Sequence, residues 1–342
     1  MKKILVLGAG AMGSAFTVPC AENRNEISLI GTHLEDELVD NLNKNNFLHP
    51  ALNTHLPKKI KISKFERFDE ELKSNPDIVA LAISSKGIDW ACEQLIKNYS
   101  KDHRFVLLTK GLTLMDNKIS TISSKINSIF KKKGLSEQNL SSVKGPCLAT
   151  GLANKIRTST VIANKNISIA KEISEIVSTD YYRTEISEDI IGVETAGAIK
   201  NIYSMLIGAS IGLSGEKIKK DIQEKYYHNT ASALFKNALA EMKKFIKLMG
   251  GKEDTAYGLA GLGDLYVSVA GGRNSMMGKY LGQGHLYLDI KEQFMKNITV
   301  EGADLALEIG PKILKDFNSN DFPIMFSLVK SICENKKLEI NW

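Results

Sequence analysis

Cysteine, tryptophan and arginine are scarce in this sequence. Its 342 residues include four cysteines and two tryptophans, and only six of the 45 basic side chains are arginines. The cysteines lie far apart in the chain, at Cys20, Cys92, Cys147 and Cys333. Their spacing argues against a zinc ribbon, a thioredoxin-like motif and a disulfide framework. No metal site is therefore predicted, and a reducing compartment, the cytoplasm, is expected.

Long apolar runs are missing as well. No stretch reaches the roughly 18 residues that a membrane-spanning helix requires, so no membrane span is expected. The net charge of +6 comes from lysines spread along the chain and opposed by 39 acidic residues, so nucleic-acid binding is not predicted. The basic and then apolar start has features of a signal peptide. Because it leads directly into a glycine motif, we predict no targeting segment.

Hydrophobic patterning divides the chain into two domains, as its length also favours. Short apolar runs at residues 4–7, 27–30, 78–83, 105–108 and 160–163 alternate with helical or polar stretches, which is typical of a parallel sheet. Helical patterns then take over, at residues 189–213, 230–249 and 303–314. We predict an α/β Rossmann domain with a mostly parallel sheet over residues 1–185, an all-α domain over residues 186–342, and a junction near residues 181–184.

A glycine motif follows the first expected strand and opens a helix expected at residues 11–22. It reads Gly8-Ala9-Gly10-Ala11-Met12-Gly13. In a G-x-G-x-x-G motif placed in this way, the first glycine allows a tight turn and the second lets a pyrophosphate approach the backbone. The third permits close packing of helix on strand, and the helix N-terminus favours the phosphate charge. The motif predicts a dinucleotide site.

The choice of dinucleotide depends on the end of the second strand. An acid that binds the ribose 2′-hydroxyl is expected there, about 20 residues after the glycines. Gly31, Thr32 and His33 hold that place instead. No carboxylate among them would repel a 2′-phosphate, although no arginine lies nearby and Glu35 and Asp36 follow closely. We expect NADP or NAD, with NADP favoured; an ordinary loop is the alternative for Thr32 and His33.

Two features of the helical half carry possible chemistry. Lys200 is the only charged residue between Thr195 and Gly215, and small residues surround it. Beside a substrate it could exchange a proton with an alcohol oxygen; a lysine that extends to solvent is the alternative. Asp264 ends a glycine-rich segment, and the Arg273-Asn274 pair follows. The planar guanidinium suits a phosphate, and a purely structural loop is the alternative.

Together these motifs resemble the NAD(P)-dependent glycerol-3-phosphate dehydrogenase family nearly end to end. Besides the glycine motif, the matching segments in order are Asn75-Pro76-Asp77, Thr109-Lys110-Gly111, Gly145-Pro146, Val193-Glu194 through Lys200-Asn201, Gly258 to Leu265, Arg273-Asn274 and Val300-Glu301-Gly302. The resemblance implies a Rossmann domain, a helical domain similar to that of 6-phosphogluconate dehydrogenase, and a homodimer. It also implies a cytoplasmic enzyme that interconverts sn-glycerol 3-phosphate and dihydroxyacetone phosphate for glycerophospholipid synthesis.

The resemblance further implies residue roles. Lys200 would be the general acid/base, Asp264 would orient it or bind a substrate hydroxyl, and Lys110 would lie between cofactor and substrate. These three form the implied catalytic set. Arg273 and Asn274 would hold the substrate phosphate. The full cofactor set is Gly8, Gly10, Ala11, Met12, Gly13, Thr32, His33, Lys110, Ala149, Arg273 and Glu301. The substrate set is Lys110, Gly145, Cys147, Lys200, Asn201, Asp264, Arg273 and Asn274.

Two departures from the family pattern keep alternatives open. Gly151 stands where the pattern G-P-x-x-A-x-E has its acid, and Gly272 replaces the serine that commonly precedes Arg-Asn. The substrate could therefore be another small phosphorylated or carboxylated hydroxy compound. A protein that senses NAD(P) without turnover is the alternative from a different class, because it needs the glycines but not Lys200.

Overall fold

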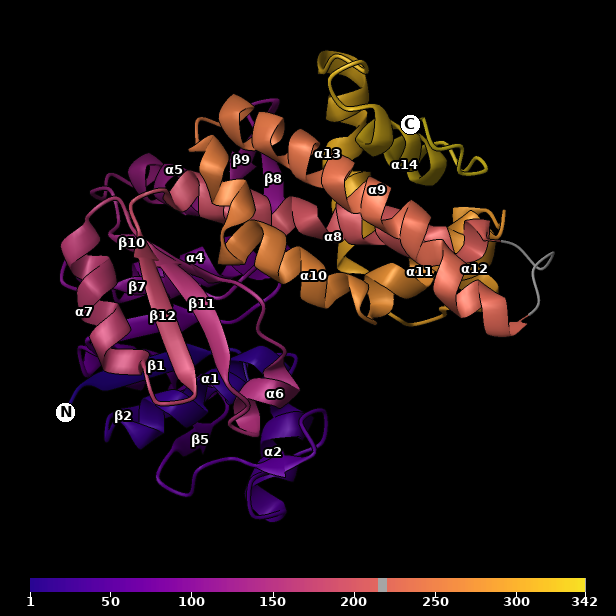
Figure 1. Cartoon of the computed structure of the whole chain (residues 1–342). Coiled ribbons are helices and arrows are strands. Elements are labelled where there is room, and N and C mark those ends of the chain that lie inside the picture. Colours follow the sequence, from indigo (N-terminus) through magenta and orange to yellow (C-terminus); the bar gives the residue numbers. More distant parts are fainter. Residues whose placement is uncertain (215–219, 342) are drawn as a thin grey trace. The chain divides into compact units, whose positions relative to one another are not determined.

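The computed structural model describes residues 1–214 and 220–341, and their side chains except those of residues 220–226. The chain divides into two compact units (Figure 1). Unit 1 comprises Met1–Lys110 and Ile122–Ile190, and unit 2 comprises Gly111–Thr121 and Ile191–Trp342. A segment inside the first half of the sequence thus belongs to the second unit. The boundary predicted between residues 185 and 186 stays a prediction.

Unit 1 is built on an eight-stranded sheet. The strands lie in the order β12 (Tyr182–Ser187), β11 (Thr158–Ala163), β10 (Leu140–Lys144), β7 (Phe105–Leu107), β6 (Ile78–Leu81), β1 (Lys3–Leu7), β2 (Glu26–Ile30) and β5 (Lys61–Ser63). Neighbouring strands pair in parallel except β10 and β11, which are antiparallel. The mostly parallel sheet and the five predicted strands are confirmed.

Three strands of this sheet, β5, β10 and β12, were not predicted. β5 has only three residues, too few to form a clear apolar run. β10 is short and mixes polar with apolar residues, so its sequence lacks a clear apolar run. β12 lies at the sheet edge with mostly accessible side chains, and an edge strand needs little apolar sequence. Residues 182–184 are the first three residues of this strand, and the domain junction expected near residues 181–184 stays a prediction.

Helices connect the strands of unit 1. They are α1 (Ala11–Glu22), α2 (Asp36–Lys44), α3 (Phe68–Lys73), α4 (Ile88–Lys97), α5 (Ile122–Lys132), α6 (Ala149–Ala153) and α7 (Ile167–Val177). Two short strands, β3 (Leu48–His49) and β4 (Thr54–His55), pair outside the main sheet. α1 is confirmed at its predicted bounds.

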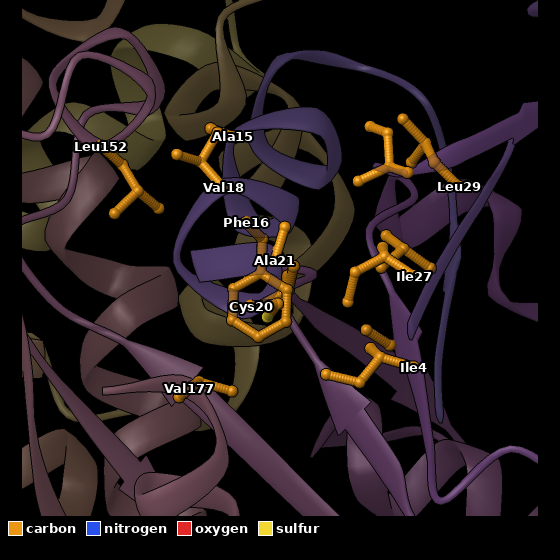
Figure 2. Packing of buried hydrophobic residues seen from close by; sticks show 14 of the residues in the cluster. Ile4, Ala15, Phe16, Val18, Cys20, Ala21, Ile27, Leu29, Leu152 and Val177 are labelled. Atoms are coloured by element: carbon orange, nitrogen blue, oxygen red, sulfur yellow. The ribbon is translucent and has the colours of Figure 1, made fainter. Parts of the chain in front are cut away.

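The core of unit 1 surrounds α1. Residues 13–21 of this helix are all buried, because the sequence there is apolar or small on every side. In Figure 2, Ile4, Ile27 and Leu29 of the sheet lie on one side of the helix, and Leu152 of α6 and Val177 of α7 lie on the other. Packing on both sides fixes the start of α1, where the glycine motif lies.

Unit 2 is mostly helical. Its helices are α8 (Ile190–Leu213), α9 (Lys220–Leu248), α10 (Asp264–Val269), α11 (Arg273–Gly282), α12 (Tyr287–Gln293), α13 (Glu301–Asp316) and α14 (Pro323–Cys333). A hairpin of β8 (Leu112–Met115) and β9 (Lys118–Thr121) packs on α13. The predicted helical domain is confirmed. α8 is buried throughout residues 192–210, so it is the central helix of the unit.

Glycines let α11 pack directly on the backbone of α8. A Cβ on Gly278 would lie 1.9 Å from the carbonyl oxygen of Met205. The same holds at the other glycines of this contact, where a Cβ would lie 2.2 to 2.5 Å from a carbonyl oxygen: Gly208, Gly212 and Gly282. Distances this short leave no room for any side chain. We call these four glycines the glycine seam.

A buried carboxyl holds α14 against α9. Glu241 of α9 accepts hydrogen bonds from the backbone N–H groups of Ile324 (2.8 Å) and Met325 (3.0 Å) and from the Tyr203 hydroxyl (3.2 Å). These N–H groups belong to the first turn of α14, which has no side-chain cap of its own. Despite these donors, burial raises the pKa of Glu241 to about 7. Glu241 therefore titrates near neutral pH.

Glu241→Gln should flatten the pH dependence of stability. Folding raises the pKa of Glu241 from 4.5 to about 7. The protonated carboxyl therefore adds to the free energy of unfolding; this addition is fully present below pH 4.5 and is lost as pH rises through 7. The loss amounts to up to about 3 kcal/mol. Glutamine stays neutral, so urea unfolding of the variant between pH 5 and pH 8 should lack this decline.

The control for this experiment is Glu334→Gln. A hydrogen bond from Lys336 lowers the pKa of the exposed Glu334 carboxyl, so it stays ionised across the window and its removal should preserve the slope. If stability falls with rising pH as steeply in Glu241→Gln as in the original protein, the Glu241 carboxyl does not have different pKa values in the folded and unfolded states.

Candidate active site

The glycine motif forms a tight turn between β1 and α1. Gly8 has a φ of +110°, and a Cβ on it would lie 2.6 Å from the carbonyl oxygen of Ala82. A Cβ on Gly13 would lie 2.1 Å from the Gly8 carbonyl oxygen. The nearest described atom to a Cβ on Gly10 would instead be a Glu35 carboxylate oxygen, 3.5 Å away. The turn is thus closed toward the sheet and more open at Gly10, which fits a pyrophosphate at the start of α1.

The predicted residues of unit 1 follow the carboxyl ends of parallel strands. Gly8 follows β1, Thr32 follows β2, Lys110 follows β7 and Gly145 follows β10. These ends lie at one edge of the sheet because the four strands are parallel. The order of the sheet reverses between β1 and β6, and ligands of open α/β sheets bind at such switch points.

Gly145, Cys147 and Ala149 lie in one short turn and the helix that follows it. Gly145 has a φ of +142°, and a Cβ on it would lie 3.0 Å from the Cα of Thr160. The half-buried Cys147 donates its backbone N–H to the Gly145 carbonyl at 2.8 Å, and Ala149 begins α6. The turn presents backbone groups at the edge of the sheet, as the resemblance implies for a substrate loop.

A carboxylate lies beside the glycine turn, although none was identified at the end of β2. The side chain of Glu35 folds back and accepts hydrogen bonds from the backbone N–H of Ala9 (3.0 Å) and of Thr32 (2.7 Å). Thr32 is half-buried, while His33 is exposed and packs its ring 4.6 Å from that of Trp90. The sequence shows Glu35 as an acid close to the end of β2, but it was not assigned to the cofactor site because it comes five residues after β2.

The buried Lys200 of α8 forms an ion pair in unit 2. Its Nζ lies 2.9 Å from Oδ1 of Asp264, the first residue of α10, and 2.5 Å from the hydroxyl of Ser268. Lys200 and Asp264 are 5% and 3% exposed, so the alternative of a lysine extended to solvent is wrong. Ser268 was not predicted, but it lies four residues after Asp264 and therefore on the same face of α10.

The next residue of α8 joins a second polar cluster. Asn201 donates to the Glu301 carboxylate at 3.2 Å and accepts from the Asn274 side-chain amide at 2.9 Å. Asn274 in turn accepts the backbone N–H of Gly302 at 2.9 Å, and Arg273 lies 3.7 Å from Glu301. All the predicted residues of unit 2 thus lie in two clusters that share α8.

Arg273 and Asn274 differ in their accessibility. Asn274 is engaged within the protein through both ends of its amide, with Asn201 and with Gly302. The side chain of Arg273 is 58% exposed. Of the two residues predicted to hold the phosphate, Arg273 is therefore the better placed to meet a ligand from solvent.

A dinucleotide turn in one unit and a buried lysine-carboxylate pair in the other define a two-unit oxidoreductase of the Rossmann class. Residues 3–170 match the family model for the NAD-dependent glycerol-3-phosphate dehydrogenase N-terminus, and residues 189–340 match the model for its C-terminus. The chain belongs to the NAD-dependent glycerol-3-phosphate dehydrogenase family, and the resemblance found from its motifs is confirmed.

Individual relatives agree with this assignment. The chain is 31% identical to an NADP(+)-dependent glycerol-3-phosphate dehydrogenase of Archaeoglobus fulgidus over 98% of this chain and 96% of that protein. It is 30% identical to a glycerol-3-phosphate dehydrogenase [NAD(P)+] of Fusobacterium nucleatum, over 98% and 94%. The fold also matches the crystal structure of glycerol-3-phosphate dehydrogenase from Coxiella burnetii, with a TM-score of 0.82 at 23% identity over 98% and 96% of the two chains.

Proposed function

We propose that this protein interconverts sn-glycerol 3-phosphate and dihydroxyacetone phosphate with NAD or NADP, and that Lys200 is its general acid/base. The observation that carries the proposal is the buried ion pair between Lys200 and Asp264, directly beside the polar cluster of Asn201. A lysine held in this way offers a positioned proton, which a protein that only senses the cofactor does not need.

Lys200 would move the proton of the reaction. In the reducing direction its ammonium gives a proton to the carbonyl oxygen of dihydroxyacetone phosphate, and in the oxidising direction its amine takes the C2 hydroxyl proton. Asp264 and Ser268, which hold Nζ at 2.9 and 2.5 Å, act by fixing the direction of this group. The side-chain geometry thus supports proton transfer at one defined atom.

The residues present fit a bound dinucleotide. The turn at Gly8, Gly10 and Gly13 would hold the pyrophosphate, and Lys110, at the carboxyl edge of the sheet, would lie between cofactor and substrate. When bound, the nicotinamide accepts or supplies the hydride at C2. Ala149 and Glu301 complete the proposed cofactor set, together with Ala11, Met12, Thr32, His33 and Arg273.

The substrate phosphate would bind the exposed guanidinium of Arg273. A planar fork can donate two parallel hydrogen bonds to a phosphate, which favours phosphorylated over neutral substrates. Asn274 would act by holding Asn201 in place. Gly145 and Cys147 would bring the backbone of their turn to the substrate.

We also propose a cellular role. Because sn-glycerol 3-phosphate is the backbone of glycerophospholipids, its formation would supply lipid synthesis in the cytoplasm, by a homodimer. The described helices include none that is long and apolar enough to cross a membrane.

Substrate-dependent oxidation of NADH and NADPH, followed by absorbance, tests the proposal. The purified protein should oxidise at least one of them rapidly with dihydroxyacetone phosphate, and far more slowly with dihydroxyacetone, which lacks the phosphate. Turnover with a carboxylated ketone such as hydroxypyruvate, but not with the phosphate, would overturn the substrate assignment. Cofactor binding without turnover on any of the three would favour a sensor.

A further inference from the structure

We propose that Glu35 makes this protein prefer NAD over NADP. The inference rests on the proposed function only in so far as a dinucleotide binds the glycine turn. It reverses the preference expected from the sequence alone. It also separates this chain from the Archaeoglobus fulgidus relative, which is described as NADP(+)-dependent.

The Glu35 carboxylate lies at the ends of two neighbouring strands, β1 and β2. Its Oε2 accepts N–H groups from Ala9, in the turn after β1, and from Thr32, just after β2. In a Rossmann domain the adenosine ribose lies across the ends of these two strands, where an acid accepts its hydroxyl groups. Although it comes later in the sequence, Glu35 places a carboxylate at that position.

The Glu35 carboxylate turns one of its two oxygens toward Gly10. This oxygen, Oε1, lies 3.5 Å from the place that a Cβ on Gly10 would take. Gly10 is the glycine at which the cofactor backbone approaches the turn. A carboxylate has about four lone-pair positions, and the N–H groups of Ala9 and Thr32 both donate to Oε2. Oε1 therefore faces the ligand side of the turn, where ribose hydroxyls can donate to it.

The acidic residues near the end of β2 carry the same sign of charge as the 2′-phosphate of NADP. A 2′-phosphate brings about −1.5 to −2 charges at neutral pH, as other phosphate monoesters do. It would meet the carboxylate of Glu35 and that of Asp36, the first residue of α2. Like charges brought together in this way oppose binding. The hydroxyls of NAD instead find an acceptor.

The neighbouring cation does not compensate for this charge. Lys64 follows β5, whose Ser63 pairs with Ile30 at the end of β2, so it is a basic residue close to this corner of the sheet. Its Nζ lies 2.8 Å from the carboxylate of Asp40 on α2. A 2′-phosphate would have to compete with Asp40 for Lys64, so the local arrangement favours a ribose diol.

Direct binding measurements test the proposal without any substrate. Titration followed by nicotinamide fluorescence should give a Kd for NADH at least about tenfold lower than that for NADPH. Glu35→Gln, which removes the charge but keeps the size, should reduce the ratio of the two Kd values by about tenfold or more. The matched control Glu37→Gln removes an exposed carboxylate from the same segment and should change the ratio far less.

Each outcome decides the question. Tighter binding of NADPH by the unaltered protein, or a ratio that Glu35→Gln leaves unchanged, overturns the proposal, as does failure to bind either cofactor. A variant that misfolds loses both cofactors together, so Glu35→Ser provides a second, smaller replacement. Preference for NADH without turnover of dihydroxyacetone phosphate would leave this inference standing and would contradict the proposed function alone.

Discussion

Lys200→Met is expected to lower kcat for reduction of dihydroxyacetone phosphate by about a hundredfold to ten-thousandfold, the range for loss of a general acid. Methionine keeps an unbranched side chain of similar length but removes the amine that would carry the proton. The Kd for NADH should stay within about threefold of the original, because the glycine turn lies in unit 1. Stopped-flow kinetics and binding titrations measure the two quantities.

The loss of the amine also leaves the carboxylate of Asp264 buried without Lys200, which costs stability. The double variant Lys200→Met/Asp264→Asn also removes the charge of Asp264. It should recover stability while remaining inactive, because the proton donor is still missing. Activity within tenfold of the original in either variant would exclude Lys200 as the general acid/base.

Gly278→Ala is expected to destabilise unit 2 by about 3 kcal/mol, at the upper end of the range for overpacking. Helix propensity alone would have the opposite effect on stability, because it favours alanine over glycine by about 1 kcal/mol. The added Cβ would lie 1.9 Å from the Met205 carbonyl oxygen, so α11 must move away from α8. Asn274 at the start of α11 would then move relative to Asn201, and KM for the substrate should rise.

Urea unfolding and steady-state kinetics test this prediction. Gly151→Ala is the control for stability, because Gly151 is also helical but the nearest atom to its Cβ would be 3.9 Å away, an ordinary contact. It should be neutral or slightly stabilising. Equal stability of Gly278→Ala and the original protein would mean that the glycine seam adjusts without cost.

The sequence predicted those features that depend on local pattern. Gly8, Gly10 and Gly13 followed a clear apolar strand, and α1 occupies its predicted range. The pair of Lys200 and Asp264 is separated by 64 residues, so only the resemblance to a family could join them. Hydrophobic periodicity describes residues within one helix or strand, so it gives no information about contacts between residues this far apart in the sequence.

What the sequence did not predict depends on how the chain folds back. Glu35 reaches the glycine turn through a bend after β2, and Ser268 reaches Lys200 because α10 begins at Asp264. The hairpin at residues 111–121 belongs to unit 2, although its sequence lies within the first half of the chain. Each of these features is a tertiary contact formed by polar or ordinary residues without a distinctive local signal.

The glycine seam restricts how substrate specificity can evolve. Because backbone meets backbone between α8 and α11, mutation cannot tune the spacing of Asn201 and Asn274 by exchanging one side chain for another. Gly272, just before Arg273, is free of this restriction. Its φ of −169° suits any residue, and a Cβ there would meet its nearest atom, the Ser268 carbonyl oxygen, at 3.7 Å. New substrates are thus more readily accommodated by changes in this loop, while the helix pair stays constant.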